Sequence, residues 1–327
     1  MENGKFVVSL DFELYWGVRD AVELYYYKPN LLAVHQVIPH LLQMFEKYNI
    51  HATFATVGFL FFENKEELIS NLPQKKPKYH NRNLSPYEGH FNLVGANEKV
   101  DPLHFANSLM EQIKNSKQEI GSHTFSHYYC LEKGQTKEDF REDLLAAENI
   151  ASKKGIELKS LVFPRDQYNG EYLDICQEMG FTSFRGNERS KLFSSKTQGK
   201  FVFIRRPFRL LDSYFNLSGH NCYSSTEMKN GKLINIPSSR FLRPFNKKLR
   251  VFEKLRLKRI KDSMTYAAKN NLAFHLWWHP HNFGKNISEN FSFLEKILLH
   301  YQQLHQQYHF ESMSMCDLAN ELNNSNE

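Results

Sequence analysis

Cysteine is scarce in this sequence, and its spacing narrows the class of protein. The four cysteines, Cys130, Cys176, Cys222 and Cys316, are scattered, and no two of them form a Cys-x-x-Cys pair. Secreted proteins that depend on a disulfide framework use cysteine densely and at close spacing. The sparse pattern therefore predicts reduced thiols in a cytosolic protein and argues against a disulfide-bonded scaffold.

Long hydrophobic runs and a strong net charge are also missing. No run approaches the roughly 18 apolar residues of a membrane-spanning helix. The N-terminus lacks the basic start and long apolar stretch of a signal peptide, so we expect a cytoplasmic protein. The formal net charge of +6 over 327 residues is too small to indicate nucleic-acid binding. With 41% hydrophobic residues, the chain can bury a large core, and we expect one catalytic domain over residues 1–327.

Segments with strand and helix periodicity alternate along the chain. The expected strands are 5–10, 51–60, 158–163 and 273–278, and the expected helices are 31–48, 104–117, 136–154, 171–179 and 291–308. Such alternation predicts βα units around a parallel sheet or barrel. Pro39 interrupts one helical pattern and marks either a kink or the true start of that helix. Residues 73–101 are polar, lack a period and predict a long loop, which is often a binding loop or lid.

Three clusters of polar residues lie where apolar strands end. In βα barrels, active sites are built at these strand ends. Asp11 and Glu13 follow the first strand, and two carboxylates two residues apart face the same way if the strand continues. One of them could bind a metal while the other accepts a proton. A solvated acidic turn is the alternative interpretation of this pair.

The histidine pair His123 and His127 is the second cluster. Residues four apart meet on one face of a helical turn, and that spacing suits two imidazoles on one zinc ion. A simple pair of hydrogen-bonded histidines would show the same spacing.

Two more strand ends supply an imidazole and a guanidinium group. His279 and His281 follow the strand that ends in Trp278, and an imidazole can act as a general acid in neutral water. Arg165 follows another strand, and its planar fork can orient a carboxylate, although a structural salt bridge is the alternative that Arg165 alone favours.

Together these groups predict a hydrolytic reaction. Two histidines and one carboxylate leave a coordination position of a metal open, where the metal can activate water and polarise a carbonyl. The second carboxylate would accept a proton from water, and a histidine would protonate the departing amine. This constellation suits hydrolysis of an unactivated amide or ester.

The order of these motifs resembles a known family. The stretches SLDFELYWG, EIGSHTFSHYYCLE, SLVFPRDQYN and HLWWHPHNFG are similar to the polysaccharide deacetylases, the NodB-homology superfamily of carbohydrate esterase family 4. The likeness extends from Ser9 to about Leu322 and favours the branch found among bacterial surface-polysaccharide biosynthesis proteins. It implies a distorted (β/α)7 barrel.

The resemblance also implies roles for single residues. Asp11 matches the general base and Arg165 the arginine that orients it, while His279 matches the general acid. His123 and His127 match the metal-binding histidines. We expect the remaining contacts to substrate from Tyr168, whose neighbourhood matches an oxyanion-hole segment, and from Trp278 and His281.

The sequence departs from the family pattern at the first motif. The family has adjacent aspartates, the second of which binds the metal, but Phe12 occupies that position here. Glu13 is therefore the candidate third ligand, with Asp11 as the other possibility. Gln167 stands where a proline is more usual, and the last motif offers His281 as an alternative acid to the preferred His279.

The expected cofactor is one divalent transition metal, with zinc as the default for two histidines and a carboxylate. The expected substrate is an N-acylated sugar, carried as a sugar nucleotide or a lipid-linked glycan. Residues 247–261 hold eight basic residues and one acid. This segment predicts either peripheral contact with the inner face of a membrane or a solvated outer helix.

Two other functions remain open at this point. The same metal chemistry could act on a small amide or ureide, since the loop at 72–101 could close a small pocket. Alternatively, the loss of the adjacent aspartate could mark an inactive glycan-binding protein, although Asp11, both histidines, Arg165 and His279 argue against it.

Overall fold

A curled parallel sheet forms the centre of the molecule. This computed structural model describes residues 1–189 and 201–324. The strands are β1 Lys5–Phe12, β2 Ala52–Thr56, β3 Glu119–Ser122, β4 Ser160–Leu161, β5 Ser183–Phe184, β6 Ile234–Asn235, β7 Arg240–Phe241, β8 Ala273–Trp278 and β9 Glu311–Met313. They follow the spatial order β6-β5-β4-β3-β2-β1-β8-β7, with β9 added beside the start of β1.

The two ends of this path lie close together. All strand pairs are parallel, and β6 and β7 are its outermost strands. The short segment between them spans the seam, because Ile236 N–H donates to Phe184 O and Ser239 N–H donates to His275 O. The sheet is therefore the predicted distorted (β/α)7 barrel rather than a flat doubly wound sheet.

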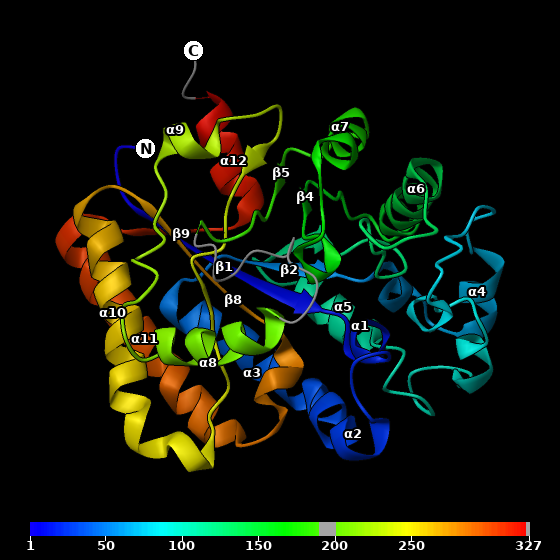
Figure 1. Cartoon of the computed structure of the whole chain (residues 1–327), viewed down its shortest axis with the longest axis horizontal. Helices are drawn as coiled ribbons and strands as arrows, with labels where there is room; N and C mark the ends of the chain where they lie inside the picture. Colours follow the sequence, from blue (N-terminus) through cyan, green and yellow to red (C-terminus); the bar gives the residue numbers. More distant parts are fainter. Residues whose placement is uncertain (190–200, 325–327) are drawn as a thin grey trace.

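Helices cover the outside of the sheet (Figure 1). Their bounds are α1 Leu14–Val18, α2 Leu24–Leu32, α3 Val34–Tyr48, α4 Lys65–Ser70, α5 Asn107–Lys114, α6 Lys137–Lys153, α7 Gly170–Glu178, α8 Phe201–Asp212, α9 Ser225–Met228, α10 Glu253–Lys269, α11 Ile287–Tyr308 and α12 Met315–Asn324. Neighbouring helices pack in the sequence α10-α11-α3-α5, and α6 packs on α7. Helix α12 covers the amino-terminal end of the strands through β1, β2 and β5.

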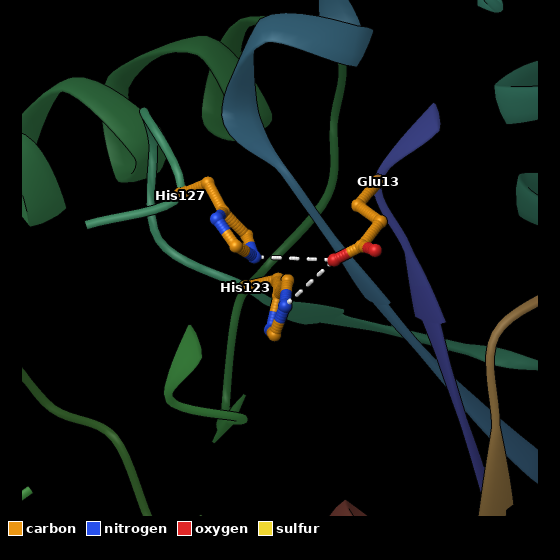
Figure 2. A group of neighbouring side chains, drawn as sticks. All are labelled: Glu13, His123 and His127. Atoms are coloured by element: carbon orange, nitrogen blue, oxygen red, sulfur yellow. Dashed lines mark ion pairs between the residues drawn. The ribbon is translucent and has the colours of Figure 1, made fainter. Parts of the chain in front are cut away.

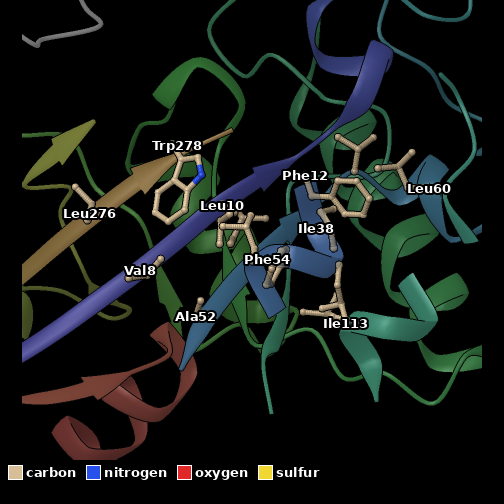
Figure 3. Close-up of a cluster of buried hydrophobic side chains, with 14 of the residues drawn as sticks. Val8, Leu10, Phe12, Ile38, Ala52, Phe54, Leu60, Ile113, Leu276 and Trp278 are labelled. Atoms are coloured by element: carbon tan, nitrogen blue, oxygen red, sulfur yellow. The ribbon is translucent and has the colours of Figure 1, made fainter. Parts of the chain in front are cut away.

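Alternation along β1 separates a core face from a polar face. Phe6, Val8, Leu10 and Phe12 point outward into the layer of helices. Figure 3 shows part of this layer, where Leu10 and Phe12 of β1 lie near Phe54 of β2 and Ile38 of α3. The intervening side chains of β1 therefore point into the barrel.

Most of the expected helices and strands are present, with shifted ends. The strand 273–278 is β8, whereas only Ser160–Leu161 of the expected strand 158–163 pairs in the sheet. Helix α3 begins at Val34 and continues through Pro39, so Pro39 is not its start. Helix α6 begins with a capping box, in which Thr136 and Asp139 satisfy each other's backbone N–H groups. Between 73 and 101 the regular structure is limited to two short 3-10 turns, η2 Arg82–Leu84 and η3 His90–Leu93, and one isolated bridge between Asn97 and Asn64, in agreement with the loop prediction.

No helix in the described part of the chain is long and apolar enough to span a membrane. All four cysteines are free thiols, as their spacing predicts.

Candidate metal and catalytic site

The two carboxylates after β1 lie on the inner face of the barrel. Asp11 is the last inward-facing residue of the strand, and Glu13 follows as the residue that precedes α1. Both are 3% exposed. Leu14 then adopts a left-handed φ of 46°, which turns the chain sharply from the strand into the short helix. The prediction that both carboxylates face the same way is confirmed.

His123 and His127 lie in a loop after β3, not on a helical turn, so the helical interpretation of their spacing is wrong. Left-handed φ values of 62° at Thr124 and 60° at His127 fold this loop back on itself. The hydroxyl of Thr124 accepts a hydrogen bond from Tyr128 N–H at 2.7 Å. The two rings therefore converge, with centroids 5.0 Å apart, by a route that periodicity does not reveal.

Glu13, His123 and His127 form the one group of potential metal ligands found among the described residues. Figure 2 shows both imidazoles pointing at the same carboxylate oxygen. Glu13 Oε2 lies 3.4 Å from His123 Nε2 and 3.1 Å from His127 Nε2. Ligands on a tetrahedral zinc ion lie about 3.3 Å apart when each bond is about 2.0 Å long, so the three donors fit a shared metal.

The other ring nitrogens are held by hydrogen bonds. His123 Nδ1 lies 2.8 Å from Val162 O, and His127 Nδ1 lies 3.1 Å from the hydroxyl of Tyr129. A carbonyl oxygen can only accept, so Nδ1 of His123 carries a proton, and in the neutral, metal-binding form of this residue the Nε2 lone pair faces the cluster. Burial lowers the pKa of His127 to about 4, which keeps it in the neutral form that binds metals.

Glu13 is ionised in this setting. Burial alone would raise its pKa, but the neighbouring His279 and the hydrogen bonds of His123 and His127 hold the pKa of Glu13 well below its usual range. Burial would lower the pKa of His123, but the hydrogen bond to Glu13 and the charges of Asp11 and Glu13 raise that pKa above its usual value, so metal binding at Nε2 competes with a proton. Two imidazoles and one carboxylate are the donor set of many catalytic zinc sites, which keep a further position open.

Asp11 is held by Arg185, a residue that the sequence analysis missed. The guanidinium group makes a bidentate pair with it, Nη1 to Oδ1 at 2.6 Å and Nη2 to Oδ2 at 2.8 Å. Arg185 follows β5, is buried, and lies over the ring of Trp277 at 4.1 Å. Burial would raise the pKa of Asp11, but the charge and hydrogen bonds of Arg185 lower it below the usual value. The FRGN stretch around Arg185 carries no signal that distinguishes it from a surface turn.

Arg165 does not contact Asp11, so that expectation is corrected. It forms an ion pair with Asp20 instead, and its guanidinium lies over the ring of Tyr129 at 4.4 Å. The hydroxyl of Tyr129 lies 3.3 Å from Asp20 and is also the partner of His127. The cause is local, because Arg165 and Asp166 have left-handed φ values of 54° and 52° and turn the side chain off the strand direction. Arg165 therefore supports a histidine of the cluster through Asp20 and Tyr129.

His279 faces both carboxylates from the end of β8. Its Nε2 lies 3.7 Å from Asp11 Oδ2 and 3.6 Å from Glu13 Oε1. His281 stacks behind it, with ring centroids 4.9 Å apart, and is 4% exposed. Burial, with a smaller effect from His279, lowers the pKa of His281 to about 3. All seven groups, Asp11, Glu13, His123, His127, Arg185, His279 and His281, line one pocket of about 280 Å³.

The side chains of two expected substrate contacts, Trp278 and Tyr168, pack away from the pocket. Trp278 is fully buried and stacks on Phe283, because alternation along β8 turns it outward into the core. Its neighbour Trp277 faces inward and lines the pocket. The ring of Tyr168 packs against Phe163 and Phe184, and its hydroxyl accepts a hydrogen bond from Asn187 N–H. Any contact of Tyr168 with substrate would therefore come from its backbone.

Two further residues shape the cluster. A Cβ at Gly17 would lie 2.2 Å from the carboxyl group of Glu13, so a larger residue there would push this ligand out of its position. Asp143 of α6 accepts hydrogen bonds from the backbone N–H of Phe125 and from Ser126, which anchors the loop between the two histidines. Burial raises the pKa of Asp143 to about 7, although its hydrogen bonds oppose that shift. In the sequence, Asp143 looks like any acid on a helix.

The family model for polysaccharide deacetylase matches residues 20–184, about half of the chain. The match includes His123, His127 and Arg165, whereas Asp11, Glu13 and His279 lie outside it. None of the curated protein sequences matches.

Solved structures with a similar fold cover nearly the whole chain. A protein of Mycobacterium smegmatis assigned to the polysaccharide deacetylases shares 11% identity with a TM-score of 0.59, over 99% of this chain and 92% of its own. The PuuE allantoinase shares 11% identity with a TM-score of 0.55, over 97% and 88%. A Pseudomonas aeruginosa PAO1 protein, also assigned to the polysaccharide deacetylases, shares 11% with a TM-score of 0.52, over 97% and 89%.

The fold and the family match define a class of hydrolases that act on acylated carbohydrates. The chain belongs to the polysaccharide deacetylase family, the NodB-homology group of carbohydrate esterase family 4.

Proposed function

We propose that this protein is a metal-dependent deacetylase that removes an N-acetyl or related acyl group from a sugar in surface-polysaccharide biosynthesis. One observation carries the proposal: three metal donors, a carboxylate held by an arginine and an imidazole all line the same pocket. Glu13, His123 and His127 would hold the metal, with zinc as the expected ion. When bound, the metal would act as a Lewis acid toward the acyl carbonyl and the attacking water.

Asp11 is the proposed general base. Arg185 occupies one side of each of its carboxylate oxygens and keeps Asp11 ionised and fixed in orientation. A carboxylate oxygen has a second lone pair, so Asp11 can still accept a proton from water that enters the pocket. The contacts thus favour Asp11 as the base and Glu13 as the ligand.

His279 is the proposed general acid. Its side chain is 22% exposed, and its Nε2 faces the carboxylates from the open side of the pocket. From there it can deliver a proton to the amine that leaves when the C–N bond breaks. His281 is more buried and its low pKa leaves it without a proton to donate at neutral pH, so its proposed role is to position His279 and border the substrate.

The test is release of acetate from N-acetylated sugars by the metal-loaded protein. We expect activity that disappears after chelation and returns with added zinc. His279→Gln should remove activity while keeping the metal, and His281→Gln should retain measurable activity. Equal losses in both variants would contradict the assignment of His279.

A ureide substrate is the main competitor, because the PuuE allantoinase has a similar fold. Allantoin should therefore be assayed beside the N-acetylated sugars under the same metal conditions. Turnover of allantoin without turnover of any acetylated sugar would replace the deacetylase proposal. Binding of sugars without turnover of either substrate would favour an inactive glycan-binding protein.

The basic segment supports a second proposal, that the protein contacts an anionic membrane surface. The segment is a 3-10 turn, η6 Lys247–Phe252, followed by α10, so it is not one continuous amphipathic helix. Ile260 and Arg259 pack inward, whereas Val251 is 73% exposed and Phe252 41% exposed. Exposed apolar groups beside Lys247, Lys248, Arg250 and Lys254 form the combination that binds anionic lipid headgroups.

Sedimentation with lipid vesicles tests this contact. Binding to phosphatidylglycerol vesicles should exceed binding to phosphatidylcholine vesicles, and it should fall with added salt. The double variant Val251→Ser and Phe252→Ser should weaken binding, while Lys137→Ala on α6 should not. Absence of binding to both vesicles at low salt would refute the contact.

A further inference from the structure

A second hollow of about 250 Å³ adjoins the catalytic pocket. Both are lined by Asp166, Phe241, Trp277 and His279. A substrate whose acyl group reaches His279 can therefore extend into this hollow without leaving the protein surface. None of the proposed catalytic steps uses the groups on its far side.

Two arginines from different elements border the hollow. Arg209 comes from the last turn of α8, and Arg243 follows β7. The Nε of Arg243 donates a hydrogen bond to Ser213 Oγ at 2.7 Å, which fixes the orientation of its guanidinium plane. Both side chains are half-buried. Guanidinium groups in fixed, partly desolvated positions are typical binders of phosphate and carboxylate.

The surroundings of this hollow carry an excess of positive charge. Behind it, Arg240 and Arg259 share the single carboxylate of Asp212, at 2.9 Å and 3.7 Å. Both arginines are at least nine-tenths buried, and the Nε of each has no hydrogen-bond partner among the described residues. One carboxylate cannot balance the charge of two buried guanidinium groups, so the electrostatic potential on this side of the hollow stays positive.

Two acidic residues line the hollow. Asp166, on the side shared with the catalytic pocket, lies 3.5 Å from the guanidinium of Arg185, and Glu188, on the far side, does not cancel this potential. Burial raises the pKa of Glu188 to about 8, against the influence of Arg240, so Glu188 is largely protonated at neutral pH. The pKa of Arg243 is lowered, first by burial and then by repulsion from Arg209 and Arg256, with Tyr214 opposing. A bound anion would relieve that repulsion.

We propose that this hollow, which we call the arginine subsite and define by Asn187, Glu188, Arg209, Ser238 and Arg243, binds a phosphoryl group attached to the acylated sugar. The inference rests on the proposed deacetylase function and narrows its substrate class to sugar phosphates and diphosphates. A carboxylate is satisfied by the fork of a single arginine, whereas a phosphoryl group presents three oxygens to donors that approach from different sides.

Calorimetric binding of glucose 1-phosphate to the metal-loaded protein tests the subsite without requiring turnover. We expect saturable binding that weakens about tenfold or more in Arg243→Ala and in Arg209→Ala. Arg243→Lys should fall between, because it keeps the charge and loses the fork. The control is Arg141→Ala on α6, which removes one exposed charge from the pair with Glu178 of α7 and should bind as wild type does. Thermal melting of each variant checks that it folds.

Three outcomes would overturn the proposal. The first is no saturable binding of glucose 1-phosphate to wild type. The second is binding that Arg243→Ala and Arg209→Ala leave unchanged, which would place the phosphate on the metal. The third is equally tight and equally arginine-dependent binding of glucuronate, which would make the ligand a carboxylate.

Two further probes distinguish the source of the phosphoryl group. Uridine diphosphate represents a nucleotide sugar, and geranyl phosphate represents a lipid carrier. Arginine-dependent binding of either compound supports the subsite. The compound that binds more tightly identifies the source of the phosphoryl group. If phosphate binding is intact but no acyl group is released from any sugar, the deacetylase proposal fails and the subsite stands. Acyl release with equal kcat/KM for neutral and phosphorylated sugars would support the deacetylase proposal and contradict the arginine subsite.

Discussion

The ends of β4 and β5 each bring an arginine to the pocket, and the two arginines serve different sides of it. Arg185, after β5, is buried and pairs with Asp11 through two hydrogen bonds. Arg165, after β4, is 39% exposed in its side chain and pairs with Asp20 beside Tyr129. The first region supports the proposed base, and the second supports a proposed metal ligand.

The difference between them lies in the backbone. Phe184 ends β5 in regular pairing, and Arg185 N–H still donates to Leu161 O, so its side chain continues the inward direction of the strand. Beyond β4, Arg165 and Asp166 are both left-handed, and the side chain leaves that direction. A residue's position just past a strand thus does not determine what its side chain meets.

Arg185→Ala should have the largest effect, because it leaves the buried carboxylate of Asp11 unpaired. We expect a loss of about 3–5 kcal/mol in the free energy of unfolding and a fall in acyl release of about 100-fold or more. Urea unfolding and steady-state kinetics measure the two effects. Arg185→Lys, which keeps the charge, should recover part of both. Wild-type stability in Arg185→Ala would mean that Asp11 is not ionised there.

Gly17→Ala should weaken metal binding and leave the proposed base unaffected. Its new Cβ would meet the carboxyl group of Glu13, so we expect metal affinity to fall by about 10–100-fold with little change in the Asp11–Arg185 pair. Competition with a chromogenic chelator measures the affinity. Gly170→Ala is the control, since a Cβ there meets nothing within 4 Å. An unchanged metal affinity in Gly17→Ala would argue against Glu13 as a ligand.

Arg165→Ala should have a milder effect of the same kind. Losing Arg165 frees Asp20 and loosens Tyr129, the partner of His127, so we expect metal affinity to fall by about tenfold. The pH dependence of kcat should stay that of wild type, because Asp11 keeps Arg185. A shifted pH profile in Arg165→Ala would indicate instead that Arg165 orients the proposed base, Asp11.

Among these variants, Asp143→Asn should have the smallest effect, which we expect in the pH dependence of stability. Its pKa rises from 3.8 to about 7 in the fold. The folded state therefore binds a proton more tightly than the unfolded chain, and stability from this group falls as pH rises between those values. We expect the stability difference between wild type and Asp143→Asn to shrink by about 1 kcal/mol per pH unit between pH 5 and pH 7. Urea unfolding at several pH values checks this, and a constant difference would contradict it.

The sequence predicted the fold and one face of the site well. Alternation along β1 was enough to place Asp11 and Glu13 together, and the strand–helix order was enough for the barrel. These features depend on local periodicity and on short connections, which a sequence displays directly.

The rest depended on backbone turns and on partners distant in sequence. The convergence of His123 and His127 requires two left-handed residues and an anchor from Asp143. The pair between Asp11 and Arg185 joins residues 174 positions apart, and Arg185 stands in no motif. The sequence favours Trp278 as a substrate contact, but Trp277 lines the pocket instead. Two adjacent tryptophans end β8, and only the register with β1 shows which one points inward.

The metal content of Asp11→Asn and Glu13→Gln, measured by elemental analysis on protein purified without a metal-affinity tag, tests the central claim most directly. We predict about one transition metal per chain in wild type and in Asp11→Asn, and little in Glu13→Gln. Loss of metal from Asp11→Asn with retention in Glu13→Gln would exchange the two roles. Absence of metal from wild type, even after incubation with zinc, would contradict a metal-dependent hydrolase altogether.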